Sequence, residues 1–250
     1  MAYVDLEREN TIAVIKLNRG KVNALNHELV NEVHDHFEKL EDDDTVRSIV
    51  LTGCGAFFSF GFDIPGLYDL TREAFTEFLV KFTDVYRYLF LYPKPLVAAI
   101  NGHAIAGGCM LATACDYRLM VSGKAKISLN EIAFGATVFQ SAVEILKYWV
   151  GPRTAQDILF TGDMYSADQA RDLGLIDGVV SSEELLQRAT ALADSFRERN
   201  LVAHAHMKKM LRLPVIETAM RHESATIEKF VDIWYSDTLR ENLRHFEIRS

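Results

Sequence analysis

The chain has 250 residues, 49% of them hydrophobic, and carries a formal net charge of −8. This length suits one large α/β domain, or a core with a small appendage, and the composition supports a sizeable core. The acidic balance argues against a general nucleic-acid-binding protein, although a local cluster of Lys and Arg would still suffice for an anionic ligand.

The first half of the chain alternates strands and helices. Residues 3–17 predict two short strands with a turn near Glu9, and residues 27–40 predict a helix that Asn26 caps. Further buried strands are predicted at 48–53, 95–102 and 117–121, with helices between them at 72–91 and 107–114. This order is typical of parallel β-α-β winding.

After Leu129 the sequence becomes mainly helical, with glycines between the segments. Helices are predicted over residues 136–150, 154–161, 166–173, 181–200 and 216–246. An α/β core is therefore followed by a helical tail.

Cysteine usage and apolar run length indicate a soluble protein of a reducing compartment. Cys54, Cys109 and Cys115 are too few and too irregularly spaced for a disulfide framework, so we expect packed free thiols. The segment Met1–Glu7 alternates and carries acids, unlike a signal or transit peptide. Charged residues or glycines interrupt the apolar runs before they reach membrane-spanning length. We expect a cytoplasmic protein without membrane or nucleic-acid partners.

Two segments combine a strand end with glycines in a way that suits a binding site. In residues 55–64 a glycine precedes bulky residues just after a strand, so the backbone can turn and aim an N–H into a cavity. In residues 98–112 a buried strand leads to Gly107, Gly108 and a helix of small residues. A helix N-terminus presents free N–H groups, and paired glycines let a ligand anion or oxyanion approach. The alternatives are an ordinary strand-to-helix turn and a close-packed helix start.

Several motifs along the chain match those of one known family. The first motif is Phe58-Ser59-Phe60-Gly61-Phe62-Asp63-Ile64, and the second runs from Asn101-Gly102 through Gly107-Gly108-Cys109 to Ala114-Cys115-Asp116-Tyr117-Arg118. Similar matches continue at residues 19–25, 160–162 and 167–179. Through these motifs, residues 3–185 resemble the enoyl-CoA hydratase/isomerase (crotonase) family, and most of all a 3,2-enoyl-CoA isomerase.

The resemblance implies a fold, an assembly and a site. The fold is α/β, with a spiral of ββα units over residues 1–195 and an α-helical trimerisation region over residues 196–250; the assembly is a trimer or a dimer of trimers. The backbone N–H groups of Phe62 and Gly107 form an oxyanion hole for a thioester carbonyl. Coenzyme A enters as part of the substrate, with no separate cofactor and no metal. The implied substrate-binding residues are Val22, Ala24, Leu25, Phe60, Gly61, Phe62, Asp63, Ile64, Gly107, Gly108 and Met110.

The acid–base residues favour one branch of that family. Hydratases carry two carboxylates, and the first position, three residues after the oxyanion glycine, is Met110 here. The second position falls in residues 127–135, whose acid is Glu131. Adding water normally divides its tasks between two acids. Moving a double bond needs only one base, which takes a proton alpha to the carbonyl and returns it at the gamma carbon. The pattern favours an isomerase with Glu131 as its base.

Two other functions stay open at this point. One is an enoyl-CoA or dienoyl-CoA hydratase that uses Glu131 with a substitute for Met110, for which Glu144 is a candidate unless it pairs with Lys147. The other is a non-catalytic acyl-CoA-binding relative, because a fold does not fix a function. We also expect the apolar residues of the tail to be buried against a neighbouring subunit. These are Ile227, Phe230, Val231, Ile233 and Trp234.

Overall fold

Two sheets form the centre of the protein in the structure, a computed structural model that describes residues 2–244. The larger sheet has the order β1 (Val4–Glu9), β2 (Ile12–Leu17), β3 (Ser48–Gly53), β5 (Leu96–Ile100), β7 (Tyr117–Val121) and β9 (Gly178–Val180). Its first two strands are antiparallel and the rest are parallel. The smaller, parallel sheet has the order β4 (Phe57–Ser59), β6 (His103–Ile105) and β8 (Ile127–Ser128).

The chain visits both sheets in each turn of a spiral. β3 leads to β4, β5 to β6 and β7 to β8, so every turn adds one strand to each sheet. The helices that close the turns are α2 (Ile64–Tyr68) with α3 (Arg72–Leu91), then α4 (Gly107–Ala114), then the 3-10 turn η1 (Glu131–Phe134) with α5 (Gln140–Thr161). The central strands β3 and β5 are buried except at Gly53, as expected for parallel strands covered on both faces. The expected spiral of ββα units is present.

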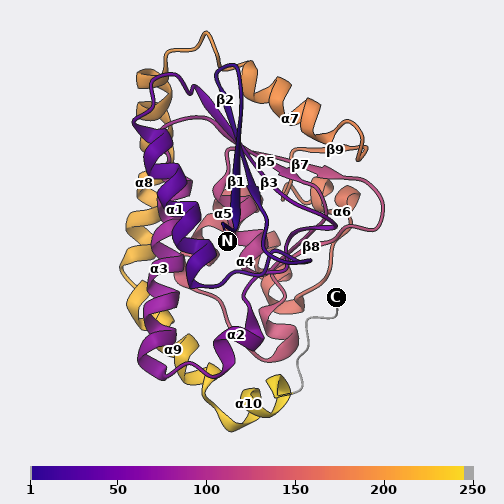
Figure 1. The fold of residues 1–250 in the computed structure, drawn as a ribbon. Helices are drawn as coiled ribbons and strands as arrows, with labels where there is room; N and C mark the ends of the chain where they lie inside the picture. Colours follow the sequence, from indigo (N-terminus) through magenta and orange to yellow (C-terminus); the bar gives the residue numbers. More distant parts are fainter. Residues whose placement is uncertain (1, 245–250) are drawn as a thin grey trace.

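Helices cover the larger sheet. The remaining helices are α1 (His27–Glu41), α6 (Ala167–Asp172), α7 (Leu185–Asp194), α8 (Leu201–Met220), α9 (Glu223–Trp234) and α10 (Asp237–Leu243). α7 packs on β3 and β5, and α3 contacts α1, α4, α8 and α9. Figure 1 shows α1, α3 and α8 running together along one side of the molecule, with α9 and α10 at its lower end. None of these described helices is both long enough and apolar enough to cross a membrane.

Most helices lie where the sequence predicts them, because the residues that begin and end them act locally. The Asn26 side chain accepts a hydrogen bond from Leu29 N at 3.0 Å and so caps α1 as expected. The helices predicted at 136–150 and 154–161 form the single element α5, which bends where Gly151 adopts a positive φ of 75°. The helix predicted at 181–200 is shorter in the structure, where α7 ends at Asp194 and Asn200 caps the next helix, α8.

The tail contradicts two predictions. The helix predicted over 216–246 is divided into the end of α8, α9 and α10, with Ser236 capping the last; residues 245–250 lie outside the described part. The apolar residues of α9 were predicted to be buried by a neighbouring subunit. Four of them (Ile227, Phe230, Val231 and Trp234) are already buried by their own chain, and Ile233 is partly buried. The prediction was wrong because α9 folds back onto α3, where the Trp234 ring stacks on Phe75 at 4.5 Å.

A buried ion cluster ties α8 to the sheet. Lys208 Nζ lies 2.6 Å from Asp116 Oδ2 and donates to the carbonyl oxygens of Tyr92 and Lys94. Arg212 Nη1 lies 2.8 Å from Asp116 Oδ1. All three charged side chains are buried, and Asp116 also accepts from the backbone N–H of Leu96 at the start of β5. Each charge is thus paired as well as hydrogen-bonded, as buried charges require.

Candidate active site

Two segments that are far apart in sequence form a short backbone ladder at the site. Phe60 N donates to Val22 O, Leu25 N donates to Gly61 O and Asp63 N donates to Leu25 O, at 2.7–2.9 Å. Residues 22–25 and 60–63, which the resemblance assigns to substrate binding, therefore lie side by side. Val22, Ala24 and Leu25 are almost fully buried, so their side chains are not available to a ligand.

This ladder orients the N–H of Phe62. Leu25 and Phe62 form a parallel bridge whose hydrogen bonds use Gly61 O and Asp63 N. Neighbouring residues of an extended strand point their N–H groups to opposite sides, so the N–H of Phe62 points away from Leu25. Gly107 is the first residue of α4, and its N–H has no partner within the helix. Both expected oxyanion donors are thus free of ladder and helix hydrogen bonds.

Glycines bring these two donors together. A Cβ on Gly61 would lie 3.1 Å from Gly107 N and 2.7 Å from Ile105 O, so only glycine lets the two segments touch. Gly61 also has a φ of +90°. A Cβ on Gly108 would lie 2.3 Å from Ser59 O, so this glycine serves close packing against β4.

Ala106, the N-cap residue of α4, is strained. It adopts φ 49° and ψ −116°, a conformation that side chains with a Cβ rarely occupy. Its N–H donates to Ser128 O at 2.8 Å, which anchors the turn to β8. Such strain costs on the order of 1–3 kcal/mol and often marks functional sites. Sequence reasoning missed this residue because nothing in a small apolar residue signals a positive φ.

A cavity of about 80 Å³ is lined by Phe62, by Ala106 next to Gly107, and by Glu131. Its other lining residues are Phe60, Ile64, Ile105, Asn130, Phe134, Phe139, Phe230 and Trp234. Glu131 begins η1 and is 4% exposed. Burial raises the pKa of Glu131 from 4.5 to about 8, because the apolar surroundings disfavour the charged form. An acid with a raised pKa in an apolar cavity is suited to exchange protons near neutral pH.

Polar atoms around this cavity lack partners. Asn130 Oδ1, Glu131 Oε2 and Trp234 Nε1 are buried, and none has a hydrogen-bond partner among the described residues. Buried polar groups are normally paired, so an unpaired set at a cavity is consistent with a ligand or water that completes it.

The structure brings no second carboxylate to the cavity among the described residues, since Glu131 is the only acid in its lining. Met110 is buried in α4 and does not line the cavity. Glu144 lies on α5 and pairs with Lys147 at 2.9 Å, as the sequence suggested, and Gln140 also donates to it.

The side chain of Asp63 serves the local structure. Its carboxylate pairs with Arg19 at 2.6 Å and accepts from Gly66 N at the start of α2. Arg19 also donates to Ala24 O, so it ties together the two segments of the ladder.

Three distant aromatic residues of the cavity were not predicted as site residues. Phe139 precedes α5, and Phe230 and Trp234 belong to α9. The sequence assigned the last two to a subunit interface, and no motif connects them to Glu131. Phe230 and Trp234 reach the cavity only because α9 folds back over it.

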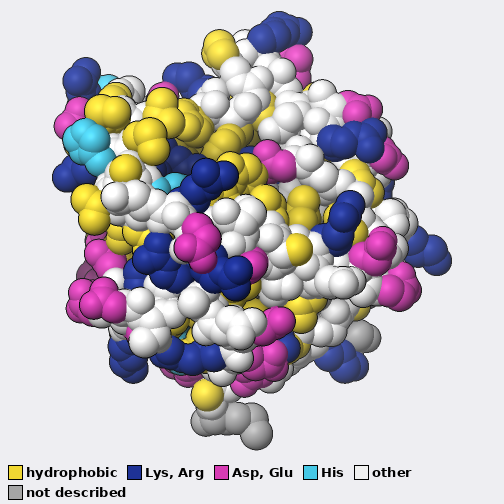
Figure 2. Space-filling view, turned by 90° about the horizontal axis from the view of Figure 1, so that it is seen from above, with side chains coloured by type: hydrophobic (Ala, Val, Ile, Leu, Met, Phe, Trp, Pro, Cys, Tyr) yellow, Lys and Arg dark blue, Asp and Glu magenta, His cyan; other side chains and the backbone are white. Residues whose placement is uncertain are grey.

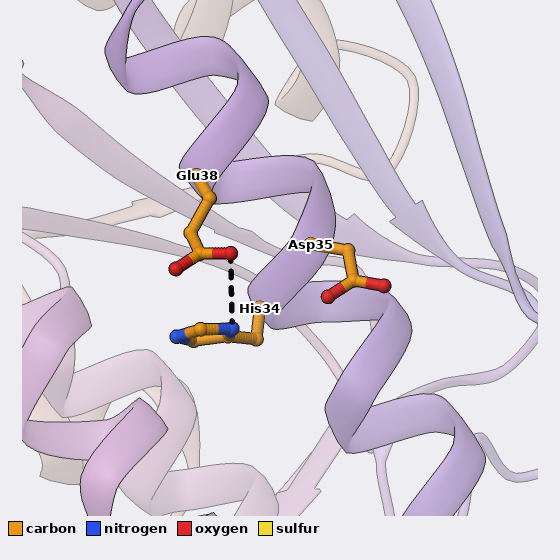
Figure 3. Close-up of side chains that lie close together, drawn as sticks. All are labelled: His34, Asp35 and Glu38. Carbon is orange, nitrogen blue, oxygen red and sulfur yellow. Dashed lines mark ion pairs between the residues drawn. The ribbon is translucent and has the colours of Figure 1, made fainter.

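Three ligand-type side chains gather elsewhere, on the outer face of α1. These are His34, Asp35 and Glu38, with His34 Nδ1 lying 3.6 Å from a Glu38 oxygen. Figure 3 shows the His34 ring and the Asp35 carboxylate extending in opposite directions from the helix. Asp35 and Glu38 are exposed, and exposed acids of this kind are common without an ion. We assign no site here.

Comparisons with known proteins agree with this geometry. The family model described as enoyl-CoA hydratase/isomerase matches residues 7–249. A crotonyl-CoA hydratase of Syntrophomonas wolfei is 36% identical, over 81% of this chain and 79% of its own length. Enoyl-CoA delta isomerase 1 of Mus musculus is 29% identical, over 97% of this chain and 85% of its own.

Solved structures show the same division between two activities. Human mitochondrial delta3-delta2-enoyl-CoA isomerase has a TM-score of 0.92 at 26% identity, covering 97% of this chain and 95% of that one. An enoyl-CoA hydratase from Bacillus halodurans has a TM-score of 0.89 at 25% identity, covering 98% and 100%. Motifs, spiral fold, paired donors and family match lead to one conclusion: the chain belongs to the enoyl-CoA hydratase/isomerase family.

Proposed function

We propose that this enzyme is a 3,2-enoyl-CoA isomerase in which Glu131 is the single acid–base group. The observation that carries the proposal is that Glu131 is the only carboxylate, among the described residues, that lines the cavity. A hydratase needs a second group, so that the incoming water is oriented and a proton is delivered to the substrate. The place where that group is expected holds Met110, which is apolar and buried.

In the proposed reaction the protein moves one proton. The ionised Glu131 carboxylate removes a proton from the carbon alpha to the thioester carbonyl, and negative charge develops on the carbonyl oxygen. The N–H groups of Phe62 and Gly107 stabilise that charge. Glu131 then returns the proton to the gamma carbon, and the double bond comes to lie next to the carbonyl. No cofactor is required beyond the coenzyme A that the substrate carries.

Substrate binding follows from the same elements. We propose that coenzyme A lies along the backbone of residues 22–25 and 60–64, with the thioester at the start of α4 near Gly107 and Gly108. Met110 would support the site from behind, since it is buried and does not reach the cavity. The acyl group then extends into the cavity that Glu131 lines.

A second function rests on the relatives. Crotonyl-CoA hydratase of Syntrophomonas wolfei is more similar in sequence than the mouse isomerase, at 36% against 29% identity. A hydratase would need a water held by Glu131 and by Asn130, whose Oδ1 is buried without a partner among the described residues.

The product ratio distinguishes the two. The purified enzyme is given a 3-enoyl thioester in labelled water, and the 2-enoyl and 3-hydroxyacyl products are quantified. We expect mainly the 2-enoyl product, and a loss of about 10²–10⁴-fold in Glu131→Gln. Glu144→Gln is the matched control and should change little, because that carboxylate lies outside the cavity. A wild type that chiefly makes the 3-hydroxyacyl product would favour the hydratase, and normal turnover by Glu131→Gln would overturn the mechanism.

We also propose a homo-oligomer, with α8 rather than α9 at its interface. Val202, Met207, Met210 and Leu211 are exposed on α8, Val202 to 82%. Figure 2 shows hydrophobic side chains gathered on the upper left of the molecule, the side on which α8 lies in Figure 1. Exposed apolar groups on this scale mark interaction surfaces. Sedimentation should show a trimer or hexamer that Met210→Glu with Leu211→Arg dissociates, and a wild-type monomer at micromolar concentration would refute the proposal.

A further inference from the structure

Four aromatic rings form a continuous stack, and three of them line the cavity. The Phe139 and Phe230 rings stack at 4.9 Å and 22°, Phe230 and Trp234 at 6.4 Å and 21°, and Trp234 and Phe75 at 4.5 Å and 24°. The first three rings line the cavity, whereas Phe75 stands behind Trp234 and does not line it. We call these four rings the aromatic wall. All four are buried, so the wall is continuous with the core.

The space in front of the wall is small. The cavity holds about 80 Å³, and a water-sized group needs about 10–15 Å³ on this measure, so on the order of six non-hydrogen atoms fit. Its lining contains Glu131 and Ala106 as well as Phe230 and Trp234. This space must therefore hold both the reacting carbons and the rest of the acyl chain.

We propose that the aromatic wall restricts this enzyme to short acyl groups of about four to six carbons, and that Trp234 sets the limit. The inference rests on the proposed function for the position of the thioester, and it adds the substrate class. Trp234 holds its place by packing alone, because its Nε1 has no hydrogen-bond partner among the described residues. Phe230 and Trp234 belong to α9, so acyl length is decided by this helix of the tail rather than by the motifs around the donors.

A second hollow argues for the opposite length preference, and the test must exclude it. It has a volume of about 300 Å³, is mainly apolar, and meets the first cavity only at Glu131. Its lining includes Leu159 and Phe160 but neither Phe62 nor Ala106. A long chain would have to pass the Glu131 side chain to enter it. Phe62 and Ala106, which belong to the segments of the two donors, line only the first cavity, so we favour that cavity for the acyl group.

Binding of saturated thioesters tests the proposal without turnover. Butyryl-, hexanoyl-, octanoyl- and dodecanoyl-CoA are titrated calorimetrically into the wild type. Each buried methylene should improve affinity about fourfold, so hexanoyl-CoA should bind more tightly than butyryl-CoA. Dodecanoyl-CoA should then bind at least about tenfold more weakly than hexanoyl-CoA, because overpacking a small cavity is unfavourable. Affinity that continues to rise to dodecanoyl-CoA would overturn the proposal and point to the second hollow.

Variants locate the limit. Trp234→Leu opens the wall and leaves no acceptor unpaired, so the ratio of dodecanoyl to hexanoyl affinity should rise at least about tenfold. Phe75→Leu is the matched control: it removes a buried ring that touches Trp234 but does not line the cavity, and the ratio should stay near the wild-type value. Trp234→Phe keeps a stacked ring and should give an intermediate ratio. An unchanged ratio in both Trp234 variants would refute the role of Trp234.

The two proposals fail separately. A short-chain binding preference without formation of 2-enoyl product would support the proposed length limit and refute the isomerase function. Efficient isomerisation at all chain lengths would support the isomerase function and refute the length limit set by the aromatic wall.

Discussion

Replacing Glu131 by Gln should stabilise the protein while removing its proposed base. Burial raises the pKa of Glu131 from 4.5 to about 8, so between these pH values the folded protein holds a proton that the unfolded chain has released. The folded wild type therefore loses stability as pH rises through this window, and the loss levels off above about pH 8. The amide variant has no ionisable group at this position and escapes the loss.

The size of the effect follows from the two pKa values. Since one pKa unit corresponds to about 1.4 kcal/mol, the carboxyl costs the wild type about 1 kcal/mol at pH 5.5, about 3 at pH 7 and about 4–5 at pH 9. The free energy of unfolding of Glu131→Gln should exceed that of the wild type by a margin that widens by about 3 kcal/mol from pH 5.5 to 9.

Urea unfolding of both proteins at these three pH values, at one protein concentration, measures the margin. The change of the margin with pH is the informative quantity, since an amide and a neutral carboxyl also differ in their hydrogen bonds. Hexanoyl-CoA binding by the variant checks that the cavity is intact. A margin that is constant with pH would mean that Glu131 has an ordinary pKa, and the reasoning from its burial would be refuted.

Three further outcomes are expected. The wild-type kcat/KM should rise with pH and level off above about pH 8, since only the ionised carboxylate acts as base; a flat profile between pH 6 and 9 would contradict this. Gly107→Pro removes one oxyanion donor and should lower kcat by about 10²–10³-fold, with a smaller effect on thioester binding; a loss confined to binding would remove Gly107 from the oxyanion hole. Ala106→Gly should raise the free energy of unfolding by about 1 kcal/mol through relief of its positive φ, measured by urea unfolding, whereas destabilisation would show that the conformation is unstrained.

Much of the fold was predictable because its signals are local. The Asn26 cap, the β-branched strand of residues 12–17 and the glycines before α4 each depend on a few neighbouring residues. The start of α8 was not predicted, because charged residues lie on its buried face and apolar residues on its exposed face. Its buried positions include Lys208 and Arg212, while Val202 and Leu211 face outward. Apolar periodicity indicates which face of a helix is buried only when apolar residues cover the core, and here paired charges do so.

The site residues likewise fall into those that the sequence predicted and those that it did not. Phe62, Gly107 and Glu131 belong to segments that the sequence singled out, and the structure places all three segments around one cavity. Phe139, Phe230 and Trp234 come from parts of the chain about 90 residues apart, and their stacking depends on the path of α9. No spacing rule connects rings at such separations, so their common position became visible only in three dimensions.

The ion cluster beneath α8 bears on how the molecule folds. Asp116 belongs to the spiral, while both of its cations, Lys208 and Arg212, arrive with the tail. A chain ending near residue 195 would lack both counterions of Asp116, and breaking such a buried pair typically costs about 3–5 kcal/mol. That loss is a large fraction of the 5–15 kcal/mol by which typical proteins are stable. The spiral and the tail should therefore unfold in one cooperative transition, and a truncated spiral should be recovered as an aggregation-prone, partly folded species rather than as an independent domain.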